Sequence, residues 1–567
     1  MVEIHLGVFS NADDAHLVWQ HDADIPGCLG FAIECRRGDG QPKYLSNRVG
    51  FENDTDVDAH GERLTVRSSQ VWPFQRYDWT DHAADLGDVI AYRVVARILD
   101  GSGELVDGPA SDWSKVQTLS ADCGDGVSSH FNRGYVLSQF MARYIQRKGI
   151  TLEKLKETAV IVSKEVDHEA RNFLGGTLRE AMLKMMTEVA QTPALELHAA
   201  LYELSDQELV DGLVAIGDRA HVVLANGSVD EEGEDENAEA RKRLRGADCQ
   251  VHDRFLAPAA LAHNKFVVIG RRADGEFAPE KVWTGSTNWT PTGLCTQLNN
   301  GIMLEDVALA ERYEAQFNLL AAAGSVVSDE LLGSNNHPKR DIRLGAATVD
   351  SWFSRLSREI DTNELVELVK GAKQGVFFVM FQPGNEPVRT LLKMQEEKKL
   401  YVRGVATQFT STGAEHFKLL KQNPEEYFLD SAQDTGISKP VGQWVVEGTA
   451  SQFRGAIGHA ITHSKVLVID PFGDDPVVVT GSHNFSKAAS SKNDENFIVI
   501  HGHHKIAMHY AINAMQTYSH YRWRAYLEES EREGRDPFQY LSRDPNWQRR
   551  RNTGETKRML AFWLPEL

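Results

Sequence analysis

Short apolar runs separated by turn-rich segments fill residues 1–120. The clearest runs begin at Ala15, Gly30, Arg63, Val89 and Trp113. Several short strands spaced by turn residues are typical of an all-β sandwich. We therefore predict an N-terminal β-sandwich, and no residue in it indicates catalysis.

Beyond residue 120 the pattern changes to helical periodicity that alternates with continuously apolar runs. Residues 130–165 are expected to be helical. The helical segment 177–190 then precedes the apolar run 195–202, and a second helical segment precedes the run 220–225. Continuously apolar strands indicate a sheet with helices on both faces. The pattern predicts an α/β fold.

The same order of elements occurs a second time. Helical segments at 363–372 and 388–398 precede the apolar runs 375–381 and 400–406. The chain therefore contains an internal duplication, and we expect two similar α-β-α halves related by a pseudo-two-fold axis.

This organisation predicts a multidomain chain. The expected segments are a sandwich at 1–120, a first half at 121–345, a second half at 346–530 and a C-terminal tail at 531–567. An aromatic-rich helix is expected over 503–526, and the basic run 548–551 is interpreted as a surface cluster. The acidic run 229–239 is interpreted as a solvated loop.

Composition narrows the function without choosing it. The 567 residues are 41% hydrophobic and 25% charged, as in ordinary globular proteins, and the net charge of −20 disfavours a general coat for nucleic acid or anionic membranes. We expect no signal peptide and no transmembrane segment. Five scattered cysteines favour a reducing cytoplasm. The sequence predicts no cofactor and no metal site, and the histidines at 501–504 are interpreted as a turn.

Two constellations of polar residues carry the candidate chemistry. In the second half His463 and Lys465 point to the same face at the start of an apolar strand, and the next apolar strand ends in Gly-Ser-His-Asn, which supplies Ser482 and Asn484. An imidazole, an ammonium, a hydroxyl and an amide together suit the oxygens of a phosphate. Glu495 is expected to accept a hydrogen bond from His463.

The first half holds a counterpart of this group: His263, Lys265, Ser286 and Asn288. One such match alone is equally consistent with a core histidine and a surface lysine. Two matches at equivalent places of a duplicated fold favour function.

These motifs resemble the signature of the phospholipase D superfamily, which is His-x-Lys, four residues, Asp, and then Gly-Ser-x-Asn. The second copy matches through Asp470 as well, and Glu495 follows it. The first copy departs: Gly270 occupies the place of the aspartate and Asn299 that of Glu495, although Asp274 could replace the acid.

A further resemblance concerns the sandwich. Leu86 lies six residues before Tyr92, as in the fibronectin type III pattern, where a leucine and a tyrosine pin a corner.

The resemblance to the phospholipase D superfamily implies metal-independent cleavage of a phosphodiester in two steps, through a covalent phosphohistidine. It implies that both lysines, both asparagines and the two serines hold the phosphate, with Asp470 and Asn299 in support. We predict His263 as the nucleophile, because its expected neighbour Asn299 is uncharged. We predict His463 as the acid and base, because a carboxylate behind it raises its pKa. The reverse assignment and an inactive site remain alternatives.

The substrate stays open at this point. A phospholipid headgroup is favoured because two motifs in one chain fit a phospholipase D. An intracellular DNA or RNA nuclease using the same two histidines is the alternative. A binding protein with a vestigial site, recruiting a protein or ligand partner through the sandwich, is the third.

Overall fold

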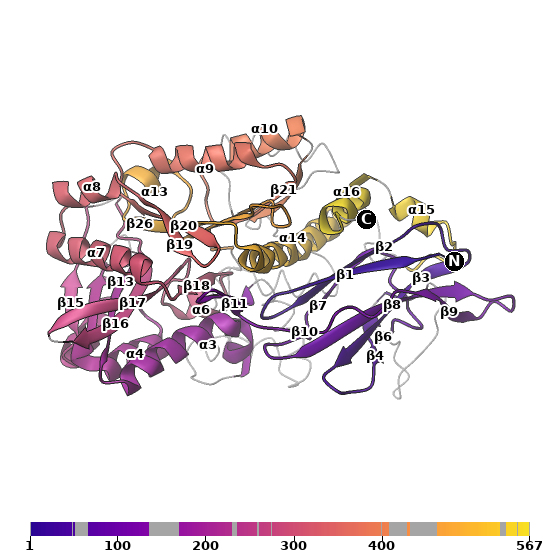
Figure 1. Cartoon of the computed structure of the whole chain (residues 1–567), viewed down its shortest axis with the longest axis horizontal. Helices are drawn as coiled ribbons and strands as arrows, with labels where there is room; N and C mark the ends of the chain where they lie inside the picture. Colours follow the sequence, from indigo (N-terminus) through magenta and orange to yellow (C-terminus); the bar gives the residue numbers. More distant parts are fainter. Residues whose placement is uncertain are drawn as a thin grey trace. The chain divides into compact units, whose positions relative to one another are not determined.

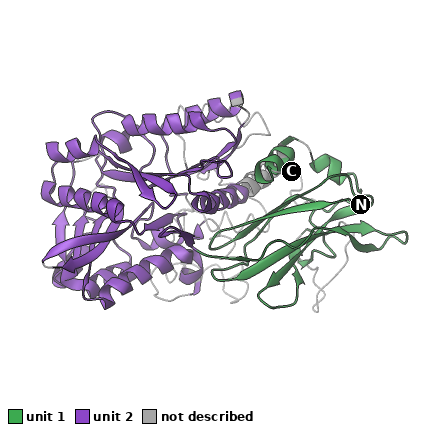
Figure 2. Cartoon of the chain, viewed as in Figure 1, with its two compact units in different colours: residues 1–120, 529–567 green, residues 121–528 purple. Residues whose placement is uncertain are grey.

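A computed structural model describes residues 2–47, 49–51, 66–134, 169–228, 235–257, 260–273, 275–398, 400–407, 428–430, 462–532, 534, 540–552 and 554–565. They form two compact units, residues 1–120 with 529–567 and residues 121–528, which Figure 2 colours separately. The segment boundaries expected from the sequence stay predictions.

The first unit is a β-sandwich, as predicted. One sheet has the order β1 (Ile4–Ser10), β2 (Ala15–His21), β7 (Asp78–Asp81). The other has the order β10 (Gln117–Thr118), β8 (Val89–Leu99), β3 (Cys28–Arg37), β4 (Lys43–Tyr44), with β9 (Leu105–Ala110) also on β8, and β5 (Ser46–Asn47) pairs with β6 (Arg67–Ser68). Trp19 of β2 meets Phe31 of β3 with ring centroids 5.8 Å apart, so the two sheets share a core.

The corner expected from Leu86 and Tyr92 is wrong. Leu86 lies in a turn and is 44% exposed, so it does not pack into the core as the expected corner requires. Tyr92 is buried, but its hydroxyl donates to the Asp81 carboxylate at 2.8 Å. The likeness to fibronectin type III stays a prediction. Residues 63–65 of one expected strand lie outside the described residues.

The C-terminal residues of this unit form α15 (Trp547–Arg551) and α16 (Gly554–Trp563). The Trp547 indole donates to the carbonyl of Cys28 at 3.0 Å, which ties α15 to β3. Arg549 of the basic run lies at the surface and pairs with Asp24. Arg549, Arg550 and Arg551 are exposed, whereas Gln548 is buried, so the three arginines form the surface cluster that the sequence indicates.

The second unit contains the predicted duplication, visible in Figure 1 as two large sheets. The first sheet has the order β11 (Asp122–Gly124), β12 (Val127–Phe131), β18 (Asn300–Leu304), β17 (Glu276–Gly285), β16 (Lys265–Ala273), β13 (Leu195–Leu201), β14 (Ala220–Leu224), β15 (Gln250–Asp253). The second has the order β19 (Lys339–Leu344), β20 (Ala347–Ser354), β26 (Glu495–His501), β25 (Val477–Gly481), β24 (Val466–Ile469), β21 (Gly375–Met380), β22 (Tyr401–Ala406), β23 (Phe428–Asp430). Both sheets are mixed: β13 to β15 and β21 to β23 pair in parallel, and the other neighbours are antiparallel.

The expected helical segments 177–190, 363–372, 388–398 and 503–526, and the one expected before the run 220–225, coincide with helices of this unit, which also contains helices that the periodicity did not predict. In the first half the helices are α3 (Glu169–Gln191), α4 (Gln207–Ile216), η2 (Gly217–Arg219), α5 (Ala238–Gly246), α6 (Pro291–Cys295), α7 (Val307–Ala323) and α8 (Asp329–Asn335). In the second half they are α9 (Ile360–Gly371), α10 (Val388–Lys398), α13 (Lys487–Ser491) and α14 (His504–Arg532), the last being the expected aromatic-rich helix. The helix expected over 130–165 is wrong at its start, because residues 130 and 131 end β12, and residues 135–168 lie outside the described part.

Helix α7 packs on both sheets. Tyr313 of α7 lies 5.1 Å from Phe266 of β16 and 4.9 Å from Phe353 of β20, measured between ring centroids. Its first turn is fixed by Asp306, whose carboxylate accepts the backbone N–H of Leu309. Because α7 follows β18 as α14 follows β26, the duplication extends beyond the sheets.

Candidate active site

The two histidines precede equivalent strands, and each is attached to the opposite half. His263 stands just before β16, and its backbone N–H donates to the Asp494 carbonyl at 2.9 Å. His463 stands just before β24, and its backbone N–H donates to the Leu298 carbonyl at 2.9 Å. Both residues are only 4% exposed. The exchange of backbone hydrogen bonds fixes both motifs across one interface.

The side chains that back the histidines are also exchanged. His263 Nδ1 lies 2.7 Å from the Glu495 carboxylate, and His463 Nδ1 lies 3.0 Å from Asn299 Oδ1. The expected bond from Glu495 to His463 is therefore wrong. The pseudo-two-fold arrangement brings the segment after each Gly-Ser-x-Asn strand beside the histidine of the other copy.

The Asn299 amide has one orientation consistent with its neighbours. Its Nδ2 donates to the Gly293 carbonyl at 2.9 Å, so its oxygen faces His463. An oxygen in that place accepts a hydrogen bond from the Nδ1–H group and leaves Nε2 of His463 free for substrate chemistry. Glu495 fixes the tautomer of His263 in the same manner.

The serines hold these backing groups. Ser286 donates to Asn299 Oδ1 at 2.7 Å and accepts the Asn300 backbone N–H at 3.1 Å. Ser482 donates to Glu495 at 3.1 Å and accepts the Asn496 backbone N–H at 3.0 Å. The phosphate contact expected of both hydroxyls stays a prediction.

Each lysine lies above an aromatic ring. Lys265 Nζ is 5.1 Å from the centre of the Tyr202 ring, and Lys465 Nζ is 5.1 Å from that of Phe381. The same rings meet the histidines edge to face: Tyr202 with His263 at 4.8 Å and Phe381 with His463 at 4.9 Å. Tyr202 and Phe381 therefore pack against the histidine and lysine of their motifs in the same way.

Sequence reasoning missed this aromatic pair. Tyr202 directly follows β13 and Phe381 directly follows β21, so their equivalent places in the duplicated pattern are the signal that could have revealed them.

The two asparagines of the motifs differ in their surroundings. Asn288 Nδ2 donates to the Glu203 carboxylate at 2.5 Å, while the Asn288 and Asn484 side-chain oxygens are buried and make no hydrogen bond among the described residues. Ser228 also donates to Glu203, at 2.6 Å. Glu203, which follows Tyr202, was likewise missed from the sequence.

Asp470 is remote from this chemistry. It follows β24, and its carboxylate accepts the backbone N–H groups of Lys373, Gln374 and Gly375 at 2.7 to 2.9 Å. It therefore fixes the start of β21, and the supporting role at the phosphate site stays a prediction. Asp274, the suggested substitute in the first copy, lies outside the described residues.

The electrostatics of the site disfavour positive charge. Burial lowers the pKa of His263 to about 4, against the opposing effect of Glu495. Burial and the two lysines bring the pKa of His463 well below its ordinary value. Burial also lowers the pKa of Lys265 to about 7 and, together with Lys265, brings the pKa of Lys465 well below its usual range. An anion in the site would raise all four values, so the arrangement suits a phosphate.

Glu495 keeps its charge in these surroundings. Burial by itself would raise the pKa of its carboxyl group, but interactions with His263, His483 and Lys265, which include the hydrogen bond from His263, outweigh burial, so the pKa lies below the ordinary value. The Glu495 carboxylate is therefore an anion held behind His263.

The family model described as "Cardiolipin synthase, PLD-like domain" matches residues 190–321 and 365–516, half of the chain. The chain belongs to this family of the phospholipase D superfamily. The two matched segments contain both His-x-Lys motifs, in agreement with the resemblance seen in the sequence.

Comparison with solved structures gives weaker likenesses. Phosphatidylserine synthase of Haemophilus influenzae is 12% identical over 59% of this chain and 84% of its own, with a TM-score of 0.38. Nuc of Salmonella typhimurium, a phospholipase D family member, is 17% identical over 31% of this chain and 95% of its own, with a TM-score of 0.22. Polyphosphate kinase of Porphyromonas gingivalis is 13% identical over 56% of this chain, which spans 45% of that protein, with a TM-score of 0.36. No curated protein matches the sequence.

Proposed function

We propose that the protein is a metal-independent phosphodiesterase that works through a covalent phosphohistidine. The observation that carries the proposal is the pair of buried imidazoles whose Nδ1 atoms are held by Glu495 and Asn299, so that each Nε2 is available to a substrate. Members of the phospholipase D superfamily act on phosphodiesters, and this chain retains both histidines and both lysines.

In the first step Nε2 of His263 attacks phosphorus, and the bond between phosphorus and the leaving oxygen breaks. His463 gives its Nε2 proton to that oxygen. In the second step His463 removes a proton from water, the water oxygen bonds to phosphorus, and the bond to His263 breaks. Lysine and asparagine side chains from both motifs would hold the phosphoryl oxygens.

The structure supports His263 as the nucleophile for a reason different from the predicted one. Its pKa of about 4 keeps the ring neutral at pH 7, which nucleophilic attack requires. The attack leaves positive charge on the ring, and the Glu495 carboxylate stabilises that charge. His463 lacks such an anion, and a bound phosphate would supply the charge that keeps its proton in place.

A phospholipid headgroup is the favoured substrate. The name of the matching family model, which refers to cardiolipin synthase, supports chemistry on a phosphatidyl group. Among the described helices, none has both the length and the apolar composition of a membrane span.

The test uses an activated diester, bis(p-nitrophenyl) phosphate, in excess chelator. Hydrolysis should fall roughly 10⁴-fold or more in His263→Ala, since a covalent nucleophile is removed. The exposed His337→Ala is the matched control. Activity that requires added metal, or that persists in His263→Ala, would refute the mechanism.

Two further measurements assign the roles and the substrate. Denaturing mass spectrometry near neutral pH should find a phosphoryl adduct on His263, accumulating in His463→Asn. A phosphatidylcholine vesicle should be cleaved faster than single-stranded or double-stranded DNA. Preference for DNA would support the nuclease instead, and inactivity on every diester would support a vestigial site.

A further inference from the structure

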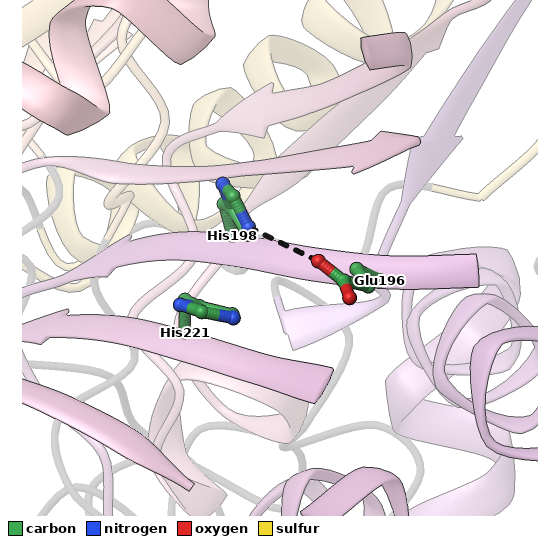
Figure 3. A group of neighbouring side chains, drawn as sticks. All are labelled: Glu196, His198 and His221. Carbon is green, nitrogen blue, oxygen red and sulfur yellow. Dashed lines mark ion pairs between the residues drawn. The ribbon is translucent and has the colours of Figure 1, made fainter. Parts of the chain in front are cut away.

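A second cluster of chemistry-bearing side chains lies in the first half, away from the catalytic motifs. Glu196 and His198 are two residues apart on β13, so they share a face, and His221 of β14 is the register partner of His198. One potential ligand atom from each lies within 4.8 Å of the others. Figure 3 shows the three side chains on the two neighbouring strands.

His198 gives the strongest indication that this cluster binds a ligand. Its Nδ1 lies 2.8 Å from the Glu314 carboxylate of α7, which fixes the tautomer. Its Nε2 is buried and makes no hydrogen bond among the described residues, although Glu196 lies 3.9 Å away. The ring stacks on Phe277 at 4.0 Å between centroids, so it is held in this orientation. Buried nitrogens without a partner are uncommon and need an explanation.

Glu196 already has one partner, but it retains capacity for another. Arg272 donates to both oxygens of its carboxylate. Each carboxylate oxygen has a second lone pair, and the Arg272 side chain is 46% exposed, so it can shift toward water. The guanidinium therefore competes with a cation at Glu196 without blocking it.

The second half lacks this cluster. His198 pairs with Val268 of β16, and Phe377 pairs with Val468 of β24. Each valine lies five residues after the histidine of its motif, so His198 and Phe377 occupy equivalent positions in the two halves. The partner of Phe377 on the next strand is Arg403, where the first half has His221. The fold thus forms without a histidine pair here, and the cluster is specific to one half.

We propose that Glu196, His198 and His221 form a binding site for one divalent transition-metal ion, with Zn²⁺ as the best fit. Two imidazole nitrogens and one carboxylate oxygen are a ligand set that zinc accepts, and a water molecule would complete four-coordination. Ligand bonds of about 2.0–2.2 Å require the three atoms to draw closer together. His221 is half-buried and is therefore the least confined of the three, because Glu196 and His198 are buried.

The ion would join β13 to β14 and take no part in the catalytic site. His198 faces Val268, which is five residues beyond His263, a separation of about 16 Å along a strand. The site would therefore be separate from the catalytic histidines, and the proposal does not depend on the proposed phosphodiesterase function.

The test measures zinc binding by the full chain. Chelator-treated protein is titrated with Zn²⁺ against a chromophoric chelator, and elemental analysis gives the stoichiometry. One tightly bound ion per chain is expected, and zinc should raise the melting temperature. His221→Gln should weaken binding at least 100-fold, whereas the exposed His337→Gln should leave it unchanged.

Two results would overturn the proposal. One is the absence of a stoichiometric ion in the wild-type chain, and the other is equal affinity in His221→Gln, which would place the ion elsewhere. Arg272→Gln adds a check that does not remove a ligand. It should bind Zn²⁺ at least as tightly as the wild type, and weaker binding would exclude Glu196 as a ligand.

Discussion

The two halves of the 121–528 unit have the same strand order but differ where the motif ends. In the second half β24 stops at Ile469, and Asp470 then accepts three backbone N–H groups at the start of β21. In the first half β16 continues through the equivalent position, Gly270, to Ala273 and pairs with β17. The second half thus uses the Asp470 side chain to bind the start of β21, whereas the first half has an extended β16–β17 hairpin at the equivalent position.

This difference shows that the first motif lacks the aspartate because the local backbone structure differs. The register of β16 with β17 shifts between Ile269 and Gly270, and a Cβ at Gly270 would lie 2.2 Å from the Ala278 carbonyl oxygen. No side chain fits there unless the backbone moves. The absence of the aspartate from the first motif is therefore explained by the β16–β17 hairpin. The site residues His263 and Lys265 are retained.

Restoring the family aspartate should have the largest effect. Gly270→Asp forces β16 away from β17 and should lower the free energy of unfolding by about 3 kcal/mol, the upper range for overpacking. Chemical denaturation measures it, with Gly333→Asp as the control because a Cβ there meets nothing within 4 Å. Equal stability of the two variants would mean that the hairpin does not exclude a side chain.

The second difference concerns the group behind each histidine, a carboxylate for His263 and an amide for His463. Glu495→Gln makes the two alike. We expect kcat to fall about 100-fold, because the charge that stabilises the phosphorylated ring is lost while an acceptor remains. Steady-state kinetics on the activated diester measures it, with the exposed Glu367→Gln as control. A change smaller than threefold would contradict the role of Glu495.

Removing the Asp470 carboxylate in the second half should have a smaller effect. Asp470→Ala leaves three backbone N–H groups without their acceptor and should lower the free energy of unfolding by about 2 kcal/mol. The exposed Asp474→Ala is the matched control. Because Asp470 is remote from the histidines, kcat below the melting temperature should not change. A large loss of kcat in the folded variant would give Asp470 a catalytic role.

Much of the fold could be predicted because its signals are local. The apolar runs 195–202 and 375–381 contain β13 and β21 almost residue for residue, and the helical periodicity of 363–372 locates α9. Repetition of these signals revealed the duplication. Weaker local signals failed: β1 and β7 were not recognised, because their residues are mostly half-exposed and lack a strong apolar run.

The sequence predicted which residues form the candidate site, but it did not predict which side chain binds each histidine. The residues of the two motifs identified the histidines, lysines, serines and asparagines. The exchange of Glu495 and Asn299 between the histidines is a property of the contact between the halves, and proximity in sequence favoured the wrong partner. The contact of Glu203 with Asn288 and the proximity of His198 to His221 were missed for a similar reason, because the folded chain brings together residues that are distant in sequence.

The smallest expected effect is also the one that best separates the two histidines. Asn299→Asp places a carboxylate 3.0 Å from Nδ1 of His463, where the amide oxygen now lies. A negative charge there raises the pKa of His463, so the ring keeps its proton to higher pH. If His463 is the acid, kcat declines as pH rises through the pKa of His463 in the substrate complex. The alkaline limb should therefore move up by about one pH unit.

The direction of the shift identifies the role. If His463 were the nucleophile it would have to be unprotonated, and the acidic limb would move up instead, because activity would begin only above the raised pKa. Loss of the Asn299 bond to Gly293 lowers stability in either case, so the position of each limb is compared and not its height. Ser286→Ala, which removes a donor to the same oxygen without adding charge, is the control. A shift of the acidic limb would reverse the assignment of the two halves and make the amide-backed histidine the one that bonds to phosphorus.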